Sequence, residues 1–225
     1  MSLIYSGKTK DVYKNSDGSL TLKLKDDATG KDGVFDPGEN AVGLSIDGLG
    51  RESLRLTKYF FEVLSGKGIP THYIDCDIGQ AEMKVVAATV FGKGLEFVCR
   101  PKAGGSFVKR YGSYVQHGVD LDFLVEVTLK DDDKGDPPIT KDTLETLGIM
   151  SGEDFQTCKF LTQKIAKIIA DDLGKKGLEL QDIKFEFGKN GDDVLLIDEI
   201  SGGCMRVYRN GKLLHPMDLT KFIIG

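Results

Sequence analysis

The 225-residue sequence has no tryptophan, only four cysteines and six prolines, and no apolar run near the ~20 residues of a membrane-spanning helix. The cysteines are scattered and form no CxxC pair, so neither a disulfide scaffold nor a zinc site is expected. The first five residues lack the layout of a signal peptide. These absences predict a protein of the reducing cytoplasm with no membrane partner.

Neither sign of charge is in large excess. The chain has 30 lysines and arginines and 35 aspartates and glutamates, giving a formal net charge of −5. This balance argues against a polyanion-binding surface over the whole chain, so no nucleic-acid partner is expected, although a local basic pocket is compatible with it. Glycine, with 28 residues, is abundant. Because few prolines accompany the glycines, they indicate tight turns or close backbone approaches rather than disorder.

The hydrophobic pattern predicts an α+β protein with mostly antiparallel sheets. Asp17-Gly18 and Asn190-Gly191 predict hairpins, and Ser151 with Asp154 predicts the start of a long helix. Residues 26–50 are rich in Gly and Asp, and we expect a long functional loop there. The expected strands are 11–14, 20–24, 82–90, 95–99, 107–109, 123–129, 182–187 and 194–198, and the expected helices are 54–65 and 153–173.

Three basic segments are candidates for holding phosphate groups. The first, Gly7-Lys8-Thr9-Lys10, puts two lysines two residues apart and hence on one face of a strand, but it lacks Walker A spacing. The second, residues 100–111, gathers Arg, Lys and Ser around two glycines, which suits an anion. The third, residues 130–137, offers a lysine for a nucleotide phosphate and an aspartate for a ligand. A solvated basic strand end or turn is the alternative for each segment.

The C-terminal hairpin offers acids for a metal ion. Mg²⁺ is bound through one or two carboxylates together with nucleotide phosphates, and Glu186 and Asp198 are the candidates. Their meeting depends on the turn. A two-residue Asn190-Gly191 loop would place the two acids on opposite faces, whereas a three-residue loop with a bulge at Gly191 would place them on one face with Lys184. The metal hypothesis therefore predicts the bulged turn, and a tight two-residue turn would refute it.

Taken together, these segments resemble the family of phosphoribosylaminoimidazole-succinocarboxamide synthetases (SAICAR synthetases) of de novo purine synthesis. The similar segments occur in the family's order and span nearly the whole chain. They are residues 5–13, 68–71, 96–111, 130–137, 182–188 and 198–206.

The resemblance implies a two-lobe fold related to ATP-grasp and kinase-like proteins, with a β-rich lobe over residues 1–80, a second lobe over residues 81–225, and ATP between them. It implies a ligase that joins aspartate to a carboxylated aminoimidazole ribonucleotide through an acyl phosphate. The implied cofactors are ATP and Mg²⁺, the implied partners are these small-molecule substrates, and a homodimer is possible.

The resemblance also assigns roles to individual residues. It places ATP against Lys8, Lys10, Val12, Met83, Val85 and Lys130, with the backbone near residues 83–85 taking the adenine. It gives Lys184, Glu186 and Asp198 to catalysis, with Glu186 and Asp198 binding Mg²⁺. It gives the ribonucleotide, including its phosphate, to Arg100, Ser106, Lys109, Asp136 and Arg206.

The sequence departs from the family pattern around the acceptor. Gly202-Gly203 stands where the family usually carries Pro-Asp, so one expected carboxylate is absent. Pro101 and Gly104 also differ from the usual residues, and the family's paired asparagines are missing from residues 45–56. Two alternatives therefore stay open: a ligase or phosphotransferase for a different phosphorylated carboxylate, and a nucleotide-binding protein without turnover.

Overall fold

The computed structural model describes residues 1–39 and 41–225, which pack into two compact units. The first unit comprises residues 1–89, 199–204 and 215–225, and the second comprises residues 90–198 and 205–214. The chain therefore returns twice to the first unit after leaving it. The expected mixture of helices with mostly antiparallel sheets is confirmed, and the lobe boundary after residue 80 stays a prediction.

The first unit is built on a five-stranded antiparallel sheet with the order β1-β2-β3-β8-β7. The hairpin predicted at Asp17-Gly18 forms, and Gly18 has the left-handed backbone that such a turn needs. Leu22, Met83 and Val85 contribute buried side chains to the core. The strands are β1 (Ser2–Ser6), β2 (Lys10–Lys14), β3 (Leu20–Leu24), β7 (Tyr73–Asp77) and β8 (Glu82–Val85).

The expected loop over residues 26–50 is wrong. Apart from residue 40, which lies outside the described residues, this segment forms a small sheet with the order β5-β4-β6 and the start of α1. Gly43 is the unpaired residue of a bulge, and a Cβ on it would lie 2.3 Å from the carbonyl carbon of Gly30. Such close backbone approach requires glycine, and these glycines interrupt the apolar alternation that identifies a strand. The strands are β4 (Asp27–Lys31), β5 (Val34–Phe35) and β6 (Val42–Ser45).

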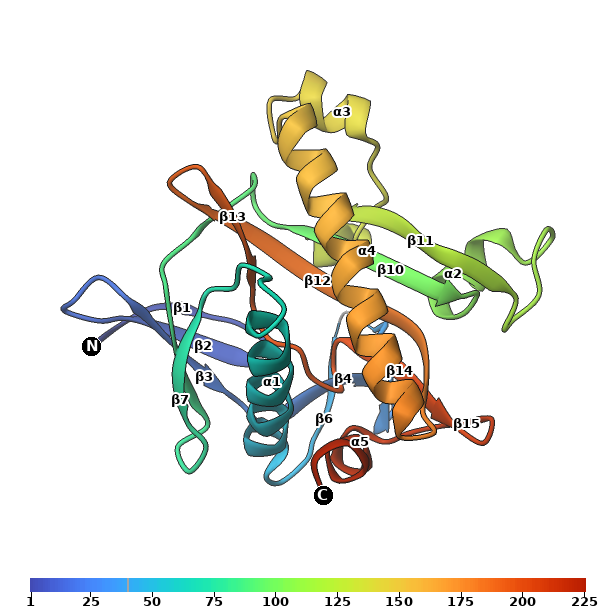
Figure 1. The fold of residues 1–225 in the computed structure, drawn as a ribbon, viewed down its shortest axis with the longest axis horizontal. Coiled ribbons are helices and arrows are strands. Elements are labelled where there is room, and N and C mark those ends of the chain that lie inside the picture. The colour runs from blue at the N-terminus through green and yellow to red at the C-terminus, as the bar shows by residue number, and fades with distance from the viewer. Residues whose placement is uncertain (40) are drawn as a thin grey trace. The chain divides into compact units, whose positions relative to one another are not determined.

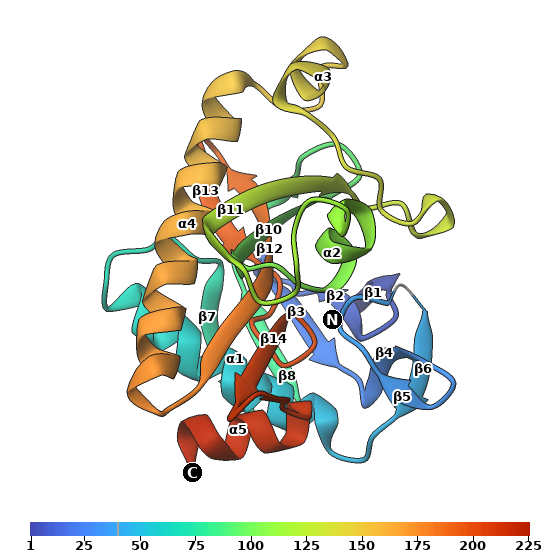
Figure 2. The same cartoon turned by 90° about the vertical axis from the view of Figure 1, so that its right-hand side faces the viewer.

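Two helices pack together in the first unit, α1 (Leu49–Ser65) and α5 (Pro216–Ile224), as Figure 2 shows. The α1 helix buries its apolar face, including Phe60 and Phe61. Its N-terminus is capped by the carboxylate of Asp26, which accepts hydrogen bonds from the amides of Gly48 (3.0 Å) and Gly50 (2.8 Å). A negative charge is favourable at this end of a helix.

The second unit contains a seven-stranded sheet. Its main path is β11-β10-β12-β14-β15, and β13 and β9 also pair with β12. Helix α4 (Gly152–Lys175) lies across this sheet in Figure 1 and packs on β10, β11, β12 and β13. The predicted cap forms, because the Ser151 hydroxyl accepts a hydrogen bond from the Asp154 amide (3.0 Å). The strands are β9 (Thr89–Val90), β10 (Leu95–Lys102), β11 (Asp120–Leu129), β12 (Glu179–Asn190), β13 (Asp193–Ile197), β14 (Met205–Arg209) and β15 (Lys212–Leu213).

One expected strand of this unit is a helix. Residues 107–109 lie in α2 (Gly105–Tyr111), because a short apolar run looks alike in a strand and in a helical turn. The remaining elements are the 3₁₀ turn η1 (Asp132–Lys134) and helix α3 (Lys141–Thr146). Within the described ranges, no helix is both long and apolar enough to cross a membrane.

Candidate active site

The two lysines near the N-terminus occupy different kinds of backbone. Lys10 begins β2, whereas Lys8 lies in the turn before it, so strand alternation does not put them on one face as expected. The Lys10 ammonium forms an ion pair with Glu199, and both side chains are mostly buried (14% and 11% exposed). Glu199 had no assigned role from the sequence, although its position in an acidic pair after an apolar strand was a signal. The structure thus anchors Lys10 through a carboxylate.

The three apolar residues assigned to the nucleotide lie in the same sheet. Val12 pairs with Leu22, which pairs with Met83, so these side chains form one cross-strand row. Val85 follows on the same face of β8 and, like Met83, is fully buried. Because β8 lies between β3 and β7, its main-chain groups face partners on both sides. Adenine recognition by the backbone of residues 83–85 stays a prediction.

In the second unit, three residues assigned to the ribonucleotide phosphate come together around one carboxylate. Arg206 Nη1 donates to both oxygens of Asp182 (3.0 and 3.1 Å), and Arg100 Nη1 lies 3.4 Å from the same carboxylate. Arg100 Nη2 also donates to the Ser106 hydroxyl (3.1 Å). Arg100 and Asp182 are almost fully buried (4% and 5% exposed). The strands and α2 therefore fix the groups of this cluster relative to one another.

A second carboxylate extends the cluster, Glu126 of β11. Its side chain accepts from Arg100 Nε (2.6 Å) and from Arg110 Nη2 (2.6 and 2.8 Å). Three guanidinium groups thus gather at two carboxylates, and guanidinium is the group that can bind phosphate through two parallel hydrogen bonds. The sequence signal that could have identified Glu126 is its position in an apolar strand. Lys109, also assigned to the substrate, lies exposed in α2 beside Arg110.

Lys184 and Glu186 of β12, both predicted to be catalytic, each form an ion pair with a residue from another segment. Glu186 lies directly opposite Glu96 of β10, and like charges in such positions repel. Lys130 Nζ lies 2.6 Å from Glu186, and Lys184 Nζ lies 2.8 Å from Glu96. Thr128 also donates to Glu96 (3.1 Å). Glu96 had no assigned role from the sequence, although it begins the family-like segment 96–111; its burial is visible only in the structure.

Asp136 lies in the turn that follows β11. Its carboxylate accepts a hydrogen bond from the Asp131 amide (2.8 Å). Burial raises the pKa of Asp136 above its ordinary value, and the negative charge of Glu96 raises it further. The carboxyl is therefore partly buried and lies within electrostatic reach of both Glu96 and Lys184.

The predicted bulged turn of the C-terminal hairpin is wrong. Glu186 pairs with Ile197 and Asn190 with Asp193, so the loop is the two-residue Gly191-Asp192. Register therefore no longer places Glu186 and Asp198 on one face. Asp198 follows the end of β13 and has a left-handed backbone (φ 70°). The alternation of side chains along the strand therefore no longer determines which face its side chain takes. The tight turn therefore refutes the register argument for a shared metal, and Glu186 and Asp198 remain a metal pair only as the family resemblance implies.

The carboxylates of Glu186 and Asp198 suit Mg²⁺, a cation that takes only one or two ligands from the protein. Among the described residues, no group of three or more His, Cys, Asp or Glu side chains is placed to enclose a metal ion. Mg²⁺ does not need such an enclosure, because it takes one or two carboxylates and completes its shell with phosphates and water. Glu186 and Asp198 are oxygen donors of this kind.

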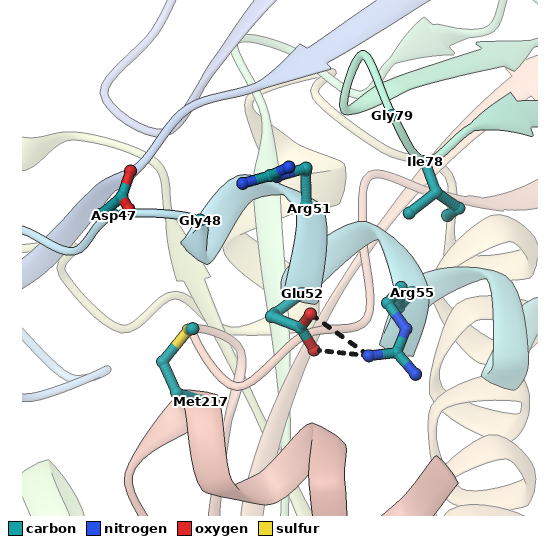
Figure 3. Close-up of a pocket in the computed structure, with 8 residues that line it drawn as sticks. All are labelled: Asp47, Gly48, Arg51, Glu52, Arg55, Ile78, Gly79 and Met217. Carbon is teal, nitrogen blue, oxygen red and sulfur yellow. Dashed lines mark hydrogen bonds and ion pairs between the residues drawn. The ribbon is translucent and has the colours of Figure 1, made fainter. Parts of the chain in front are cut away.

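A surface pocket of about 380 Å³ lies elsewhere in the first unit, along α1. Figure 3 shows Arg51, Glu52 and Arg55 of α1 lining it with Met217 of α5, and Arg55 is paired with Glu52 (3.1 Å). The residues that line this pocket include none of those assigned to a substrate or cofactor.

Comparisons with known proteins agree with the resemblance. The SAICAR synthetase family model matches residues 3–218. The chain is 56% identical over 226 residues to a phosphoribosylaminoimidazole-succinocarboxamide synthase of Clostridium tetani, covering all of both chains. It is 37% identical to the synthase of the same name from Thermotoga maritima (93% of this chain, 86% of the relative). A solved SAICAR synthetase in complex with ADP superposes with a TM-score of 0.83 at 32% identity (98% of this chain, 91% of the other).

Proposed function

The chain belongs to the SAICAR synthetase family, and from that premise we propose that it makes an amide bond between aspartate and a carboxyaminoimidazole ribonucleotide at the expense of ATP. The 56% sequence identity to a named synthase, over the full length of both chains, supports this reaction. The structural observation that supports it most directly is the cluster of Arg100, Ser106 and Arg206, which brings together two guanidinium groups and a hydroxyl that suit a phosphate.

The chemistry requires activation of a poor electrophile. A carboxylate oxygen of the ribonucleotide attacks the γ-phosphorus of ATP, ADP leaves, and an acyl phosphate remains. The aspartate amine then attacks the acyl carbon, phosphate departs with the former carboxylate oxygen, and the amine loses a proton. Negative charge thus accumulates during the first step, and cationic side chains stabilise it.

The residues of the chain divide these tasks. We assign Lys8, Lys10 and Lys130 to the ATP phosphates, with Lys10 held by Glu199 and Lys130 by Glu186. Lys184, fixed by Glu96, lies on the same face of the sheet as Glu186 and is assigned to the reacting carboxylate. Mg²⁺, when bound, supplies charge neutralisation at the phosphates, and Glu186 and Asp198 would hold it.

Turnover with defined substrates tests the proposal. The purified protein is incubated with ATP, Mg²⁺, aspartate and the ribonucleotide, and both ADP and the amide product are measured. We expect ADP and product in equal amounts, and ADP release that depends on both acceptor and amine. ATP binding without turnover would instead support a nucleotide-binding protein.

A related ligase for a different phosphorylated carboxylate is the second candidate, and Gly203 is the observation that favours it. A Cβ at this position would meet only the Ser201 hydroxyl at 3.4 Å, which is ordinary contact, so the backbone here leaves room for a side chain to begin. The missing carboxylate is therefore a chemical difference and not a steric requirement. ADP release only with another carboxylate would favour this candidate.

A further inference from the structure

Gly104, at the start of α2, is a glycine for reasons of space. Its backbone is extended (φ −170°), a conformation that any residue adopts. A Cβ built there would lie 2.4 Å from Cδ and 2.5 Å from Oε1 of Gln181. The side chain of Gln181 thus fills the volume that a residue at position 104 would need.

Gln181 reaches this position through a β-bulge. On β12, Leu180 pairs with Val207 and Asp182 pairs with Arg206, which leaves Gln181 as the extra residue. A bulge redirects the side chains beside it. Here Gln181 packs against Gly104. Asp182 accepts a hydrogen bond from Arg206, and the Arg206 guanidinium would lie 2.7 Å from a Cβ on Gly105. Two neighbouring residues of one strand therefore support two neighbouring glycines.

The Gln181 amide also holds the loop that follows α2. Its Nε2 lies 2.8 Å from Nε2 of His117, and the next residues of the loop are tied to Ala103 by two backbone hydrogen bonds of 2.8 Å (Gly118 N to Ala103 O, and Ala103 N to Val119 O). Gln181 is 3% exposed, and its Oε1 is buried with no hydrogen-bond partner among the described residues. An unpaired buried oxygen costs stability, which an apolar side chain of similar size would not.

We propose that Gln181 and His117 are a positioning pair: they fix the turn 103–106 and thereby set Ser106 against Arg100, and Gly105 against Arg206, for the ribonucleotide phosphate. This inference rests on the proposed function of that cluster. Gln181 is too deeply buried to touch the substrate, so its effect reaches the ligand only through Gly104 and His117.

Gln181→Leu tests the pair, because leucine keeps the bulk but loses the hydrogen bond and the unpaired oxygen. We expect KM for the ribonucleotide to rise about three- to tenfold, the loss corresponding to one hydrogen bond, with kcat and KM for ATP unchanged. The midpoint of urea unfolding should stay the same or rise. An unchanged KM would overturn the proposal. So would a raised KM accompanied by a lower kcat and a lower unfolding midpoint.

A mutant cycle tests the contact with Gly104. Gly104→Ala should raise the same KM by pushing on Gln181, whereas Gln181→Val has no δ atoms to be pushed. The double variant should therefore match Gln181→Val alone; additive effects would contradict the contact.

Binding of inorganic phosphate is measured by calorimetry on wild type and on Gln181→Leu. It distinguishes failure of the positioning role from failure of the proposed reaction. Weaker binding by the variant supports positioning even if wild type fails to convert the ribonucleotide. Equal binding, with normal wild-type turnover, would refute the positioning pair and leave the proposed function intact.

Discussion

The Lys130 ammonium lies 2.6 Å from the carboxylate of Glu186, and Glu186 lies directly across the sheet from Glu96. The Lys130 ammonium offsets the negative charge of Glu186, which lies opposite the carboxylate of Glu96. The ion pair also joins a residue assigned to the ATP phosphates with one assigned to Mg²⁺. On this assignment, nucleotide and metal meet ammonium and carboxylate groups that already contact one another.

Glu186→Gln should abolish Mg²⁺-dependent turnover, with a loss of about two orders of magnitude or more, because an amide is a much weaker ligand for a hard cation. The fold should persist, since glutamine keeps the shape and accepts a hydrogen bond from Lys130. Steady-state rates across a Mg²⁺ titration, with circular dichroism as the folding control, make the measurement. An unchanged rate would refute the metal assignment.

Lys10→Met should raise KM for ATP about tenfold or more, because a charge-assisted contact to phosphate is lost. Removing Lys10 also takes one cation away from Glu199, whose side chain is mostly buried, so stability should fall. Combining Lys10→Met with Glu199→Gln should restore stability but not KM. Lys23→Met is the matched control from the same sheet, since Lys23 pairs with Glu82 at the surface (43% and 27% exposed). Equal effects of the two methionine variants would contradict the assignment of Lys10.

Asp136→Asn should stabilise the fold at neutral pH. Burial and the charge of Glu96 raise the pKa of Asp136 above 3.8, so the folded state binds this proton more tightly than the unfolded chain does. Ionisation therefore costs stability as pH rises from 3.8 through the raised pKa. The variant should match wild type at acid pH and exceed it at neutral pH in urea unfolding.

Asp131→Asn is the control from the same turn. A hydrogen bond from Lys134 lowers the pKa of Asp131, so its charge favours the fold above 3.8. This variant should show no gain at neutral pH. A gain in both variants would mean that burial of Asp136 is not the cause.

Gly203→Asp should fold with little change in stability, because the space beside Gly203 is open apart from the Ser201 hydroxyl. Gly202→Ala should destabilise, because its Cβ would lie 2.6 Å from Cβ of Pro216. The KM values of Gly203→Asp for aspartate and for the ribonucleotide then report whether a carboxylate here takes part in acceptor recognition. Unchanged values would argue that this position has no part in it.

The sequence predicted the elements whose signals are local. The hairpin at Asp17-Gly18, the capped helix after Ser151 and the α+β class need only nearest neighbours and apolar spacing. It did not predict β4, β5 and β6, because Gly30 and Gly43 interrupt the pattern to let two strands approach closely.

The candidate site shows the same division. Arg100, Ser106 and Arg206 were expected together from motifs and do share one cluster. Their partners Asp182 and Glu126 come from other strands, and pairing across a sheet is not visible in spacing along one segment. The hairpin register likewise depends on which residues enter the turn: Gly191-Asp192 forms it, whereas the expected loops were Asn190-Gly191 and a three-residue loop with a bulge at Gly191.

The route of one oxygen atom tests the central claim, ATP-dependent amide formation through an acyl phosphate. The ribonucleotide is labelled with ¹⁸O at both carboxylate oxygens and turned over with ATP, Mg²⁺ and aspartate, and the released phosphate and the amide product are analysed by mass spectrometry. The account predicts one ¹⁸O in each phosphate and one ¹⁸O retained in the amide. Unlabelled phosphate accompanying the amide would contradict it.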